Sequence, residues 1–267
     1  MHPILIKLGP VVIHTYGFLL ALGVLSAILL SLKLGKKENL DIQVLADFSF
    51  YTILVGLLGA KLFLLVTEWK YYSEAPKRIL SLITSAGTFY GGLICGAIFV
   101  IWYVHKHKLN IRVIGDVMLP AVALAHFFGR MGCFMAGCCW GRNADGCPVA
   151  VEFPKAGYDS TGVPYNEPLY PTQLAESILN LLNFILLMIL FNKKKFQGQV
   201  MAVYVFNYSL IRFCIEFFRG DDDRGYLFGG IDHPFTSLSV PQLISIAGII
   251  LAIVLYFRFK KNSKQKG

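Results

Sequence analysis

Two long stretches of this chain, Tyr16–Leu32 and Val240–Phe257, contain no charged residue at all. Each approaches the roughly 20 apolar residues that cross a lipid bilayer as a helix. Across the whole chain, 55% of the residues are hydrophobic and only 15% are charged, whereas a soluble domain carries roughly 25% charged residues. The sequence therefore predicts an integral membrane protein.

The first apolar run is expected to stay in the protein as a membrane helix. A cleavable signal peptide has a basic start and an apolar core of only about 7–15 residues. Here the run is longer, and Pro3 and Pro10 precede it where basic residues would be expected.

The apolar segments predict an all-α, polytopic membrane protein with about seven transmembrane helices. The expected spans lie at about 14–33, 45–66, 88–104, 113–129, 173–191, 200–218 and 240–258. We expect one transmembrane domain, residues 1–267. Its long outer loops, at about 141–172 and 219–239, are more typical of lids or binding loops than of simple connections.

Basic residues gather in alternate connections between these spans and predict the orientation of the chain. They are Lys33, Lys36, Lys37, Lys106, Lys108, Arg112, Lys193, Lys194, Lys195, Arg258, Lys260, Lys261, Lys264 and Lys266. Because basic loops stay on the cytoplasmic side, the N-terminus is predicted outside and the C-terminus inside. The net charge of +9 reflects this signal and suits anionic lipid headgroups, so no nucleic-acid partner is expected.

Charged residues inside the expected spans are the strongest functional signal. In the segment SLIRFCIEFFRG, Arg212, Glu216 and Arg219 occur at positions i, i+4 and i+7, which share one face of a helix. A charge at the middle of a bilayer costs about 2.5–3.5 kcal/mol, so this stripe is expected to face the bundle interior or a wet cavity.

Three further charged residues, Lys61, Arg130 and Glu176, fall in the outer halves of other spans. We expect the whole set to converge just beneath the outer surface. Structural ion pairs between helices are one explanation. The surplus of cations over carboxylates favours a bound anion instead, and a lipid phosphate is the candidate best suited to bidentate arginine donors.

Aromatic and imidazole groups occur at the same expected level. His14 and Tyr16 begin the first span, although interfacial tyrosines are common in membrane proteins anyway. Tyr90 precedes Gly91 and Gly92. These glycines allow either close helix packing or access for a substrate.

The segment HFFGRMGCFMAGCCWGR, which contains Arg130, is rich in glycine and cysteine. Its glycines predict a backbone that bends or is closely approached, with amides exposed to receive an anion. This segment resembles the signature of the prolipoprotein diacylglyceryl transferase family, G-R-x-G-x-F-x-x-G-x-x-W-G. The matching residues are Gly129, Arg130, Gly132, Phe134, Gly137, Trp140 and Gly141.

The resemblance covers nearly the whole chain. IHTYG is similar to the N-terminal element of the family, YPTQLAE to its Pro-[Ser/Thr]-Gln-Leu-x-Glu element, RFCIEFFR to its Arg-Phe-x-x-Glu-Phe-x-Arg element, and SVPQLIS to the start of its last helix. The matching residues are His14, Tyr16, Gly17, Pro171, Gln173, Glu176, Arg212, Glu216 and Arg219.

This resemblance implies an enzyme of bacterial lipoprotein maturation. It would transfer the diacylglyceryl group of phosphatidylglycerol to the lipobox cysteine thiol of a preprolipoprotein, forming a thioether and releasing glycerol phosphate. The implied partners are phosphatidylglycerol, preprolipoprotein signal peptides and the lipid bilayer. The implied location is the bacterial plasma (inner) membrane, as a multi-pass protein. No cofactor is implied, and no metal ligand is assigned.

The expected catalytic residues are Arg130, Arg212, Glu216, Tyr90 and His14. The expected substrate-binding residues are Arg130, Tyr16, Gly132, Gly137, Gln173, Glu176, Arg219 and Lys61. The two arginines of the catalytic set would hold the phosphate and stabilise its departure, with Glu216 orienting Arg212. The acceptor thiol must become a thiolate to react, and His14, Tyr90 and Glu176 are all candidates for its base.

The chain departs from the family pattern at several positions. Many members have Asn and Glu in the signature where this chain has Cys133 and Cys138, followed by Cys139, and many have His in place of Tyr90. With Cys147, the outer cysteines are spaced C-x4-C-C-x7-C. A disulfide of Cys147 with Cys138 or Cys139, a metal site and packed free thiols are the three interpretations.

Two other function classes fit the residues less well. A lipid or solute transporter would use its charged residues as a relay. Such residues would be spread over both halves of the membrane, whereas those of this chain are expected in the outer half. A related membrane protein with altered chemistry would use its cysteines as a metal or redox site.

Overall fold

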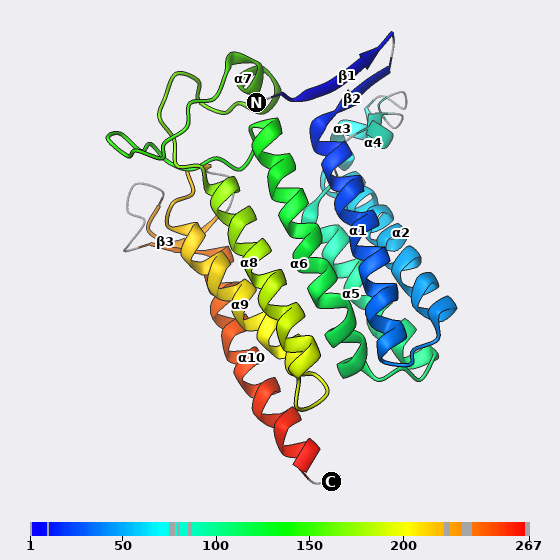
Figure 1. The fold of residues 1–267 in the computed structure, drawn as a ribbon. Coiled ribbons are helices and arrows are strands. Elements are labelled where there is room, and N and C mark those ends of the chain that lie inside the picture. The colour runs from blue at the N-terminus through cyan, green and yellow to red at the C-terminus, as the bar shows by residue number, and fades with distance from the viewer. Residues whose placement is uncertain are drawn as a thin grey trace. The chain divides into compact units, whose positions relative to one another are not determined.

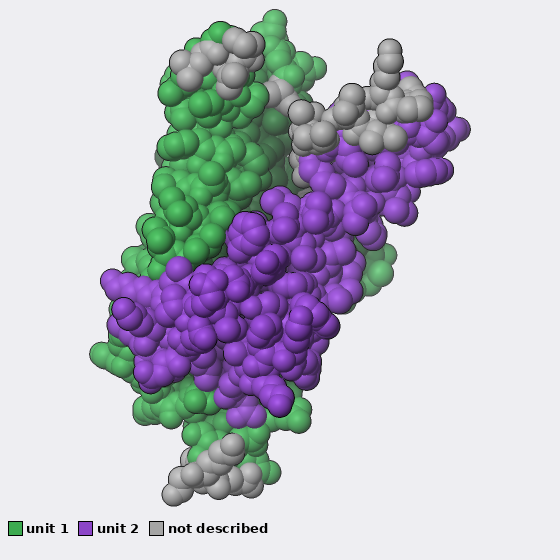
Figure 2. All heavy atoms as spheres, turned by 90° about the vertical axis from the view of Figure 1, so that its right-hand side faces the viewer, with its two compact units in different colours: residues 1–31, 115–267 green, residues 32–114 purple. Residues whose placement is uncertain are grey.

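The computed structural model describes residues 2–9, 11–74, 78, 81–84, 87–221, 225–230 and 237–264. The chain divides into two compact units, which Figure 2 shows in green and purple. Unit 1 comprises residues 1–31 and 115–267, and unit 2 comprises residues 32–114. The single transmembrane domain expected from the sequence stays a prediction.

Helices dominate both units (Figure 1). Unit 2 holds α2 (Ile42–Thr67), α3 (Trp69–Ser73), α4 (Ser81–Thr84) and α5 (Phe89–Lys106). Helices α1 (Thr15–Lys37) and α6 (Ile111–Ala136) lie mostly in unit 1. The other elements of unit 1 are β1 (Ile4–Leu8), β2 (Val11–His14), α7 (Lys155–Thr161), α8 (Thr172–Lys193), α9 (Gln199–Glu216), β3 (Tyr226–Phe228), β4 (Leu238–Ser239) and α10 (Val240–Lys264).

Five of these helices are long and apolar enough to cross a membrane: α1, α2, α6, α8 and α10. Helix α5 is apolar but shorter, and α9 carries Arg212 and Glu216 near its end. The chain is therefore a helical, polytopic membrane protein. Two small antiparallel sheets, β1–β2 and β3–β4, add strands that the all-α prediction did not contain.

Helix packing in unit 1 depends on small and polar residues. Helix α9 packs against both α8 and α10 (Figure 1). Helix α1 approaches α6 at Gly23, where an added Cβ would lie 2.9 Å from the Cβ of Phe128. On α8, the Ser177 hydroxyl donates to the Phe127 carbonyl of α6 at 3.0 Å. Such contacts hold membrane helices together where lipid removes the hydrophobic driving force.

Asp116 joins the early part of α6 to the start of α9. Its carboxylate is fully buried and lies 3.1 Å from the Lys194 ammonium. It also accepts hydrogen bonds from the backbone amides of Gly198 and Met201 at 2.9 and 3.0 Å. A carboxylate at a helix N-terminus is stabilised by these amides and by the helix dipole, so Asp116 fixes where α9 begins.

In unit 2, α2 packs against α5 through facing glycines. A Cβ added at Gly91 would lie 2.7 Å from the Gly59 carbonyl oxygen, and one added at Gly92 would lie 3.0 Å from that of Gly56. Both distances are too short for a real side chain. Gly91 and Gly92 therefore serve close helix packing, the first of the two alternatives drawn from the sequence.

The long segment between α6 and α8 is an ordered cap with a small core of its own. Phe153, Val163 and Leu169 are buried there, and Phe134 and Trp140 pack against them. Isolated bridges pair Val151 with Leu169 and Phe153 with Tyr165. Residues 222–224 and 231–236 of the other expected outer loop lie outside the described residues.

Candidate active site

Helix α6 is longer than the sequence predicted and reaches Ala136. Arg130 therefore lies within the helix rather than at its end. Gly137 has a φ of 83°, a left-handed conformation that ends a helix at little cost only in glycine. The amides of Gly137 and Cys138 both donate to the Cys133 carbonyl, at 2.9 and 3.2 Å. These amides are occupied, so the predicted anion cradle is wrong for this part of the segment.

Arg130 forms an ion pair with Glu176 of α8, and its Nη2 lies 3.0 Å from Oε1 of the carboxylate. The Glu176 side chain is 2% exposed and that of Arg130 is 21% exposed. The guanidinium also interacts with Tyr208 of α9, whose ring packs at a tilt against that of His126 with centroids 4.9 Å apart. Three helices thus meet around Arg130.

Arg212 and Glu216 pair one turn apart on α9, with Nη2 and Oε2 separated by 2.8 Å. The other terminal nitrogen of Arg212, Nη1, is buried and has no hydrogen-bond partner within the described residues. A buried donor left unsatisfied costs roughly 1–3 kcal/mol, and more when it is charged. No described residue satisfies this nitrogen.

Arg219 does not continue the helical stripe predicted from the sequence, because α9 ends at Glu216. Its Nε donates to Oδ1 of Asp221 at 2.8 Å, and its Nη2 pairs with Oδ2. Burial opposes the charge of Arg219, but the hydrogen bonds to Asp221 and the nearby Cys139 sulfur outweigh it and raise the pKa of the guanidinium.

Each of these three arginines is therefore paired with a carboxylate. Within the predicted set, the three arginines of unit 1 are thus matched by three carboxylates, those of Glu176, Glu216 and Asp221. A guanidinium nevertheless carries five N–H donors. The contact of Arg212 with Glu216 uses Nη2 and leaves Nη1 without a hydrogen-bond partner among the described residues. Lys61 belongs to unit 2, where its ammonium donates to the Leu82 carbonyl at 2.8 Å.

Tyr16 packs on α6 at Gly132, two residues after Arg130. A Cβ added at Gly132 would lie 3.1 Å from Cδ2 of Tyr16, so this glycine makes room for the ring. Tyr16 interacts electrostatically with Arg130. His14 is exposed on β2, opposite Ile4.

Two residues at the start of α8 hold the segment that follows α6. The Gln173 side-chain amide donates to the Cys138 carbonyl at 2.9 Å, and the Thr172 hydroxyl donates to the Cys139 carbonyl at 3.0 Å. Gln173 is 1% exposed. The structure thus gives this predicted substrate-binding residue a clear positional role. Tyr90 is half exposed at the start of α5 in unit 2.

The thiols of Cys133, Cys138 and Cys139 converge, with all three sulfurs within 4.8 Å of one another. All six cysteines of the chain are free thiols, so Cys147 forms no disulfide. Hydrogen bonds from the Cys133 and Cys138 thiols lower the pKa of Cys139, and Arg219 and Arg130 act in the same direction. Hydrogen bonding with Cys133 and with Cys139, together with burial, raises the pKa of Cys138.

Comparison with known proteins decides the family. The model of the prolipoprotein diacylglyceryl transferase family matches residues 3–258 of this chain. The chain belongs to this family. The phosphatidylglycerol–prolipoprotein diacylglyceryl transferase 2 of Clostridium perfringens is 36% identical over 256 residues, covering 96% of this chain and 94% of that protein.

Other relatives with the name phosphatidylglycerol–prolipoprotein diacylglyceryl transferase match over similar lengths. The Clostridium tetani protein is 34% identical over 98% of this chain and 100% of its own length. The Streptococcus uberis protein is 32% identical over 99% of this chain and 96% of its own length.

In this member of the family, Tyr208 is a site residue that the sequence reasoning missed. It lies one turn before Arg212 on α9 and contacts Arg130. Its position continues the Arg212–Glu216 spacing by four residues towards the N-terminus, so the helical period could have found it. Asn207 and Asn183 form another missed contact, a side-chain hydrogen bond of 2.9 Å between α9 and α8.

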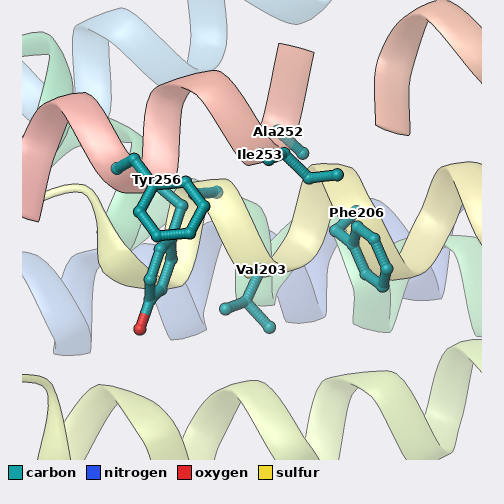
Figure 3. A pocket seen from close by; sticks show the side chains of 7 residues that line it. Val203, Phe206, Ala252, Ile253 and Tyr256 are labelled. Carbon is teal, nitrogen blue, oxygen red and sulfur yellow. The ribbon is translucent and has the colours of Figure 1, made fainter. Parts of the chain in front are cut away.

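A shallow groove lies between α9 and α10 of this family member, apart from the charged residues. Figure 3 shows Val203 and Phe206 of α9 beside Ala252, Ile253 and Tyr256 of α10. The lining is almost entirely apolar. Val203 precedes Arg212 by about two and a half helical turns, so this groove suits a hydrocarbon chain rather than a headgroup.

Proposed function

We propose that this chain transfers the diacylglyceryl group of phosphatidylglycerol to the lipobox cysteine thiol of preprolipoproteins. The products are a thioether-linked lipid and glycerol phosphate. Family membership and the names of relatives matched over almost their whole length support this function. The structural observation that best supports this function is that Nη1 of Arg212 is buried and has no hydrogen-bond partner among the described residues.

The phosphate of the donor lipid binds beside the two paired arginines of the helix bundle. Glu176 and Glu216 fix the guanidinium groups of Arg130 and Arg212 from one side. Because each carboxylate contact uses only some of the five donors of an arginine, the others can bind phosphate oxygens. The singly charged phosphodiester of the lipid then supplies the hydrogen-bond acceptor that Arg212 Nη1 lacks among the described residues.

Transfer requires that the bond between the glyceryl carbon and the phosphate oxygen breaks while a carbon–sulfur bond forms. The thiolate sulfur supplies the electron pair of the new bond, and the electron pair of the broken bond leaves on the phosphate oxygen. Arginines fixed in a site of low dielectric constant stabilise the charge that develops there. The thiol proton must leave first, because the thiolate is the nucleophile.

The expected topology is part of this proposal. Seven membrane helices, with the N-terminus outside and the basic connections in the cytoplasm, place Arg130 and Arg212 near the outer leaflet of the bacterial plasma membrane. The distribution of lysine and arginine supports this orientation. There the chain would meet both phosphatidylglycerol and the signal peptides of secreted preprolipoproteins.

Reconstitution tests the activity directly. The full chain in phosphatidylglycerol vesicles is incubated with a peptide containing a lipobox cysteine, and the peptide mass is measured. We expect a mass gain equal to one diacylglyceryl group, and no gain for the same peptide with serine in place of cysteine. Absence of the adduct from properly folded protein would rule out the proposed function.

Matched arginine variants test the role of the phosphate site. Arg130→Ala and Arg212→Ala should abolish most transfer, whereas Arg112→Ala on α6 should retain it, because Arg112 lies in the first turn of that helix, about five turns before Arg130. Full activity in the Arg130→Ala and Arg212→Ala proteins would refute the phosphate assignment.

A further inference from the structure

Within the described residues, the Cys133–Cys138–Cys139 cluster is the one group of three or more potential metal ligands whose donor atoms converge. Its sulfurs lie within 4.8 Å of one another. Three thiolates bound tetrahedrally at about 2.3 Å from one zinc ion would lie about 3.8 Å apart. Small side-chain rotations would therefore bring all three sulfurs onto a single ion.

The backbone that brings the sulfurs together is fixed from several sides. Gly137 and Cys139 both adopt left-handed conformations, with φ values of 83° and 63°. Such a conformation is uncommon for a residue other than glycine, so Cys139 is held there by its surroundings. Gln173 and Thr172 bind the carbonyls of Cys138 and Cys139. The cluster is thus a preorganised site rather than a chance meeting of mobile side chains.

The position of the cluster ties it to the chemistry of the family site. Cys133 lies on the same helix as Arg130, less than one turn further on. Arg130 and Arg219 both interact electrostatically with the Cys139 sulfur. Three thiolates around one divalent ion carry one net negative charge, which these nearby arginines would offset.

We propose that Cys133, Cys138 and Cys139 bind one thiophilic divalent ion of the zinc class, and that the acceptor cysteine thiol takes its fourth position. Three protein ligands with one open position are the pattern of catalytic rather than structural zinc sites. This inference rests on the proposed function, because the acceptor thiol is its fourth ligand.

Metal binding would solve the problem of how the acceptor thiol loses its proton. A thiol bound to such an ion is deprotonated outright, so the proton passes to solvent and the sulfur keeps its electron pair. That pair then forms the carbon–sulfur bond as the carbon–oxygen bond to phosphate breaks. Tyr90 would then not be needed as a base.

Metal content is the first test. The full chain is purified with reduced thiols, loaded with Zn²⁺ and analysed for bound metal and by X-ray absorption. We expect one ion per chain with three sulfur ligands at about 2.3 Å. Replacing any one of the three cysteines with serine should weaken zinc binding by more than ~100-fold, the largest effect typical of residues that only hydrogen-bond to a metal ligand. Cys147→Ser and Cys95→Ser are the matched controls and should bind normally.

The fourth ligand is tested by adding the lipobox peptide without lipid. The cysteine peptide should add a fourth sulfur to the ion, and the serine peptide should not. Failure of reduced protein to bind zinc would overturn the proposal, as would a disulfide between two of the three cysteines in the active enzyme. A bound ion whose ligands do not change with the cysteine peptide would overturn the role in thiol activation.

Activity measurements separate this inference from the proposed function. If zinc-free protein forms the diacylglyceryl adduct at the full rate, the metal proposal fails and the proposed function stands. If zinc-loaded protein with three sulfur ligands forms no adduct, the proposed function fails while the metal site stands. Loss of transfer in zinc-free protein, with recovery on adding Zn²⁺, supports both.

Discussion

The guanidinium of Arg130 on α6 and the carboxylate of Glu176 on α8 form an ion pair, with Nη2 and Oε1 3.0 Å apart. Glu176 is almost completely buried, and the pair joins two helices that both carry residues of the family signatures. A buried pair is costly to break because the remaining charge has no partner. The contact therefore positions Arg130 as well as joining the helices.

Replacing Glu176 with glutamine should destabilise the protein by about 3 kcal/mol, because Arg130 would keep its charge without its carboxylate. Thermal unfolding in detergent measures the change. The exposed Glu152→Gln variant is the control and should unfold like the unmodified protein. In a double-mutant cycle with Arg130→Gln, the two changes should be far from additive, and additivity would argue that the pair contributes nothing.

Arg212→Lys should lower the turnover rate by about 100-fold, the typical effect of removing one donor that stabilises developing charge. Lysine keeps the positive charge but lacks the second terminal nitrogen that Nη1 provides. Initial rates at several phosphatidylglycerol concentrations separate turnover from lipid binding. Arg112→Lys should behave like the unmodified chain. A change in KM alone would assign Arg212 to ground-state binding instead.

Gly137→Ala should destabilise the protein by about 1–2 kcal/mol, because its left-handed φ of 83° disfavours a side chain. The added Cβ would also lie 3.2 Å from the Val163 side chain. Gly129→Ala is the contrasting control, because a Cβ added at this helical position meets no other atom within 4 Å. This substitution should stabilise the protein by up to about 1 kcal/mol. Equal effects at the two positions would contradict this account.

Asp116→Asn should destabilise unit 1 by about 3 kcal/mol, because the partly buried Lys194 ammonium loses the fully buried carboxylate that it pairs with. The start of α9 would also lose a carboxylate that accepts hydrogen bonds from the backbone amides of Gly198 and Met201. Hydrogen exchange at Gly198 and Met201 should therefore accelerate. The exposed Asp145→Asn variant should leave stability and exchange as they are. Unchanged exchange in the Asp116 variant would show that the carboxylate does not fix the start of α9.

Tyr90→Phe should reduce transfer by less than about tenfold, whereas loss of a general base typically costs about 100-fold or more. The reason is that metal coordination, in the proposal above, supplies the thiolate without Tyr90. Adduct formation measured over a range of pH values checks this expectation. A loss of 100-fold or more would return Tyr90 to the role of base.

The sequence by itself determined the long apolar helices and the family. Runs of residues without charge predicted the membrane helices, because a membrane-crossing helix must be apolar along about 20 residues. Period and spacing placed Arg212 and Glu216 on one face of α9, where they pair. The signature around Arg130 indicated the family that the comparisons confirm.

Only the tertiary structure decided which groups meet. The sequence did not show that Glu176 pairs with Arg130, that Arg219 leaves the helix to bind Asp221, or that three thiols converge. Periodicity reports neighbours along one helix, whereas these contacts depend on packing between helices and on the left-handed turns at Gly137 and Cys139. Such contacts arise only when distant parts of the chain are brought together in space.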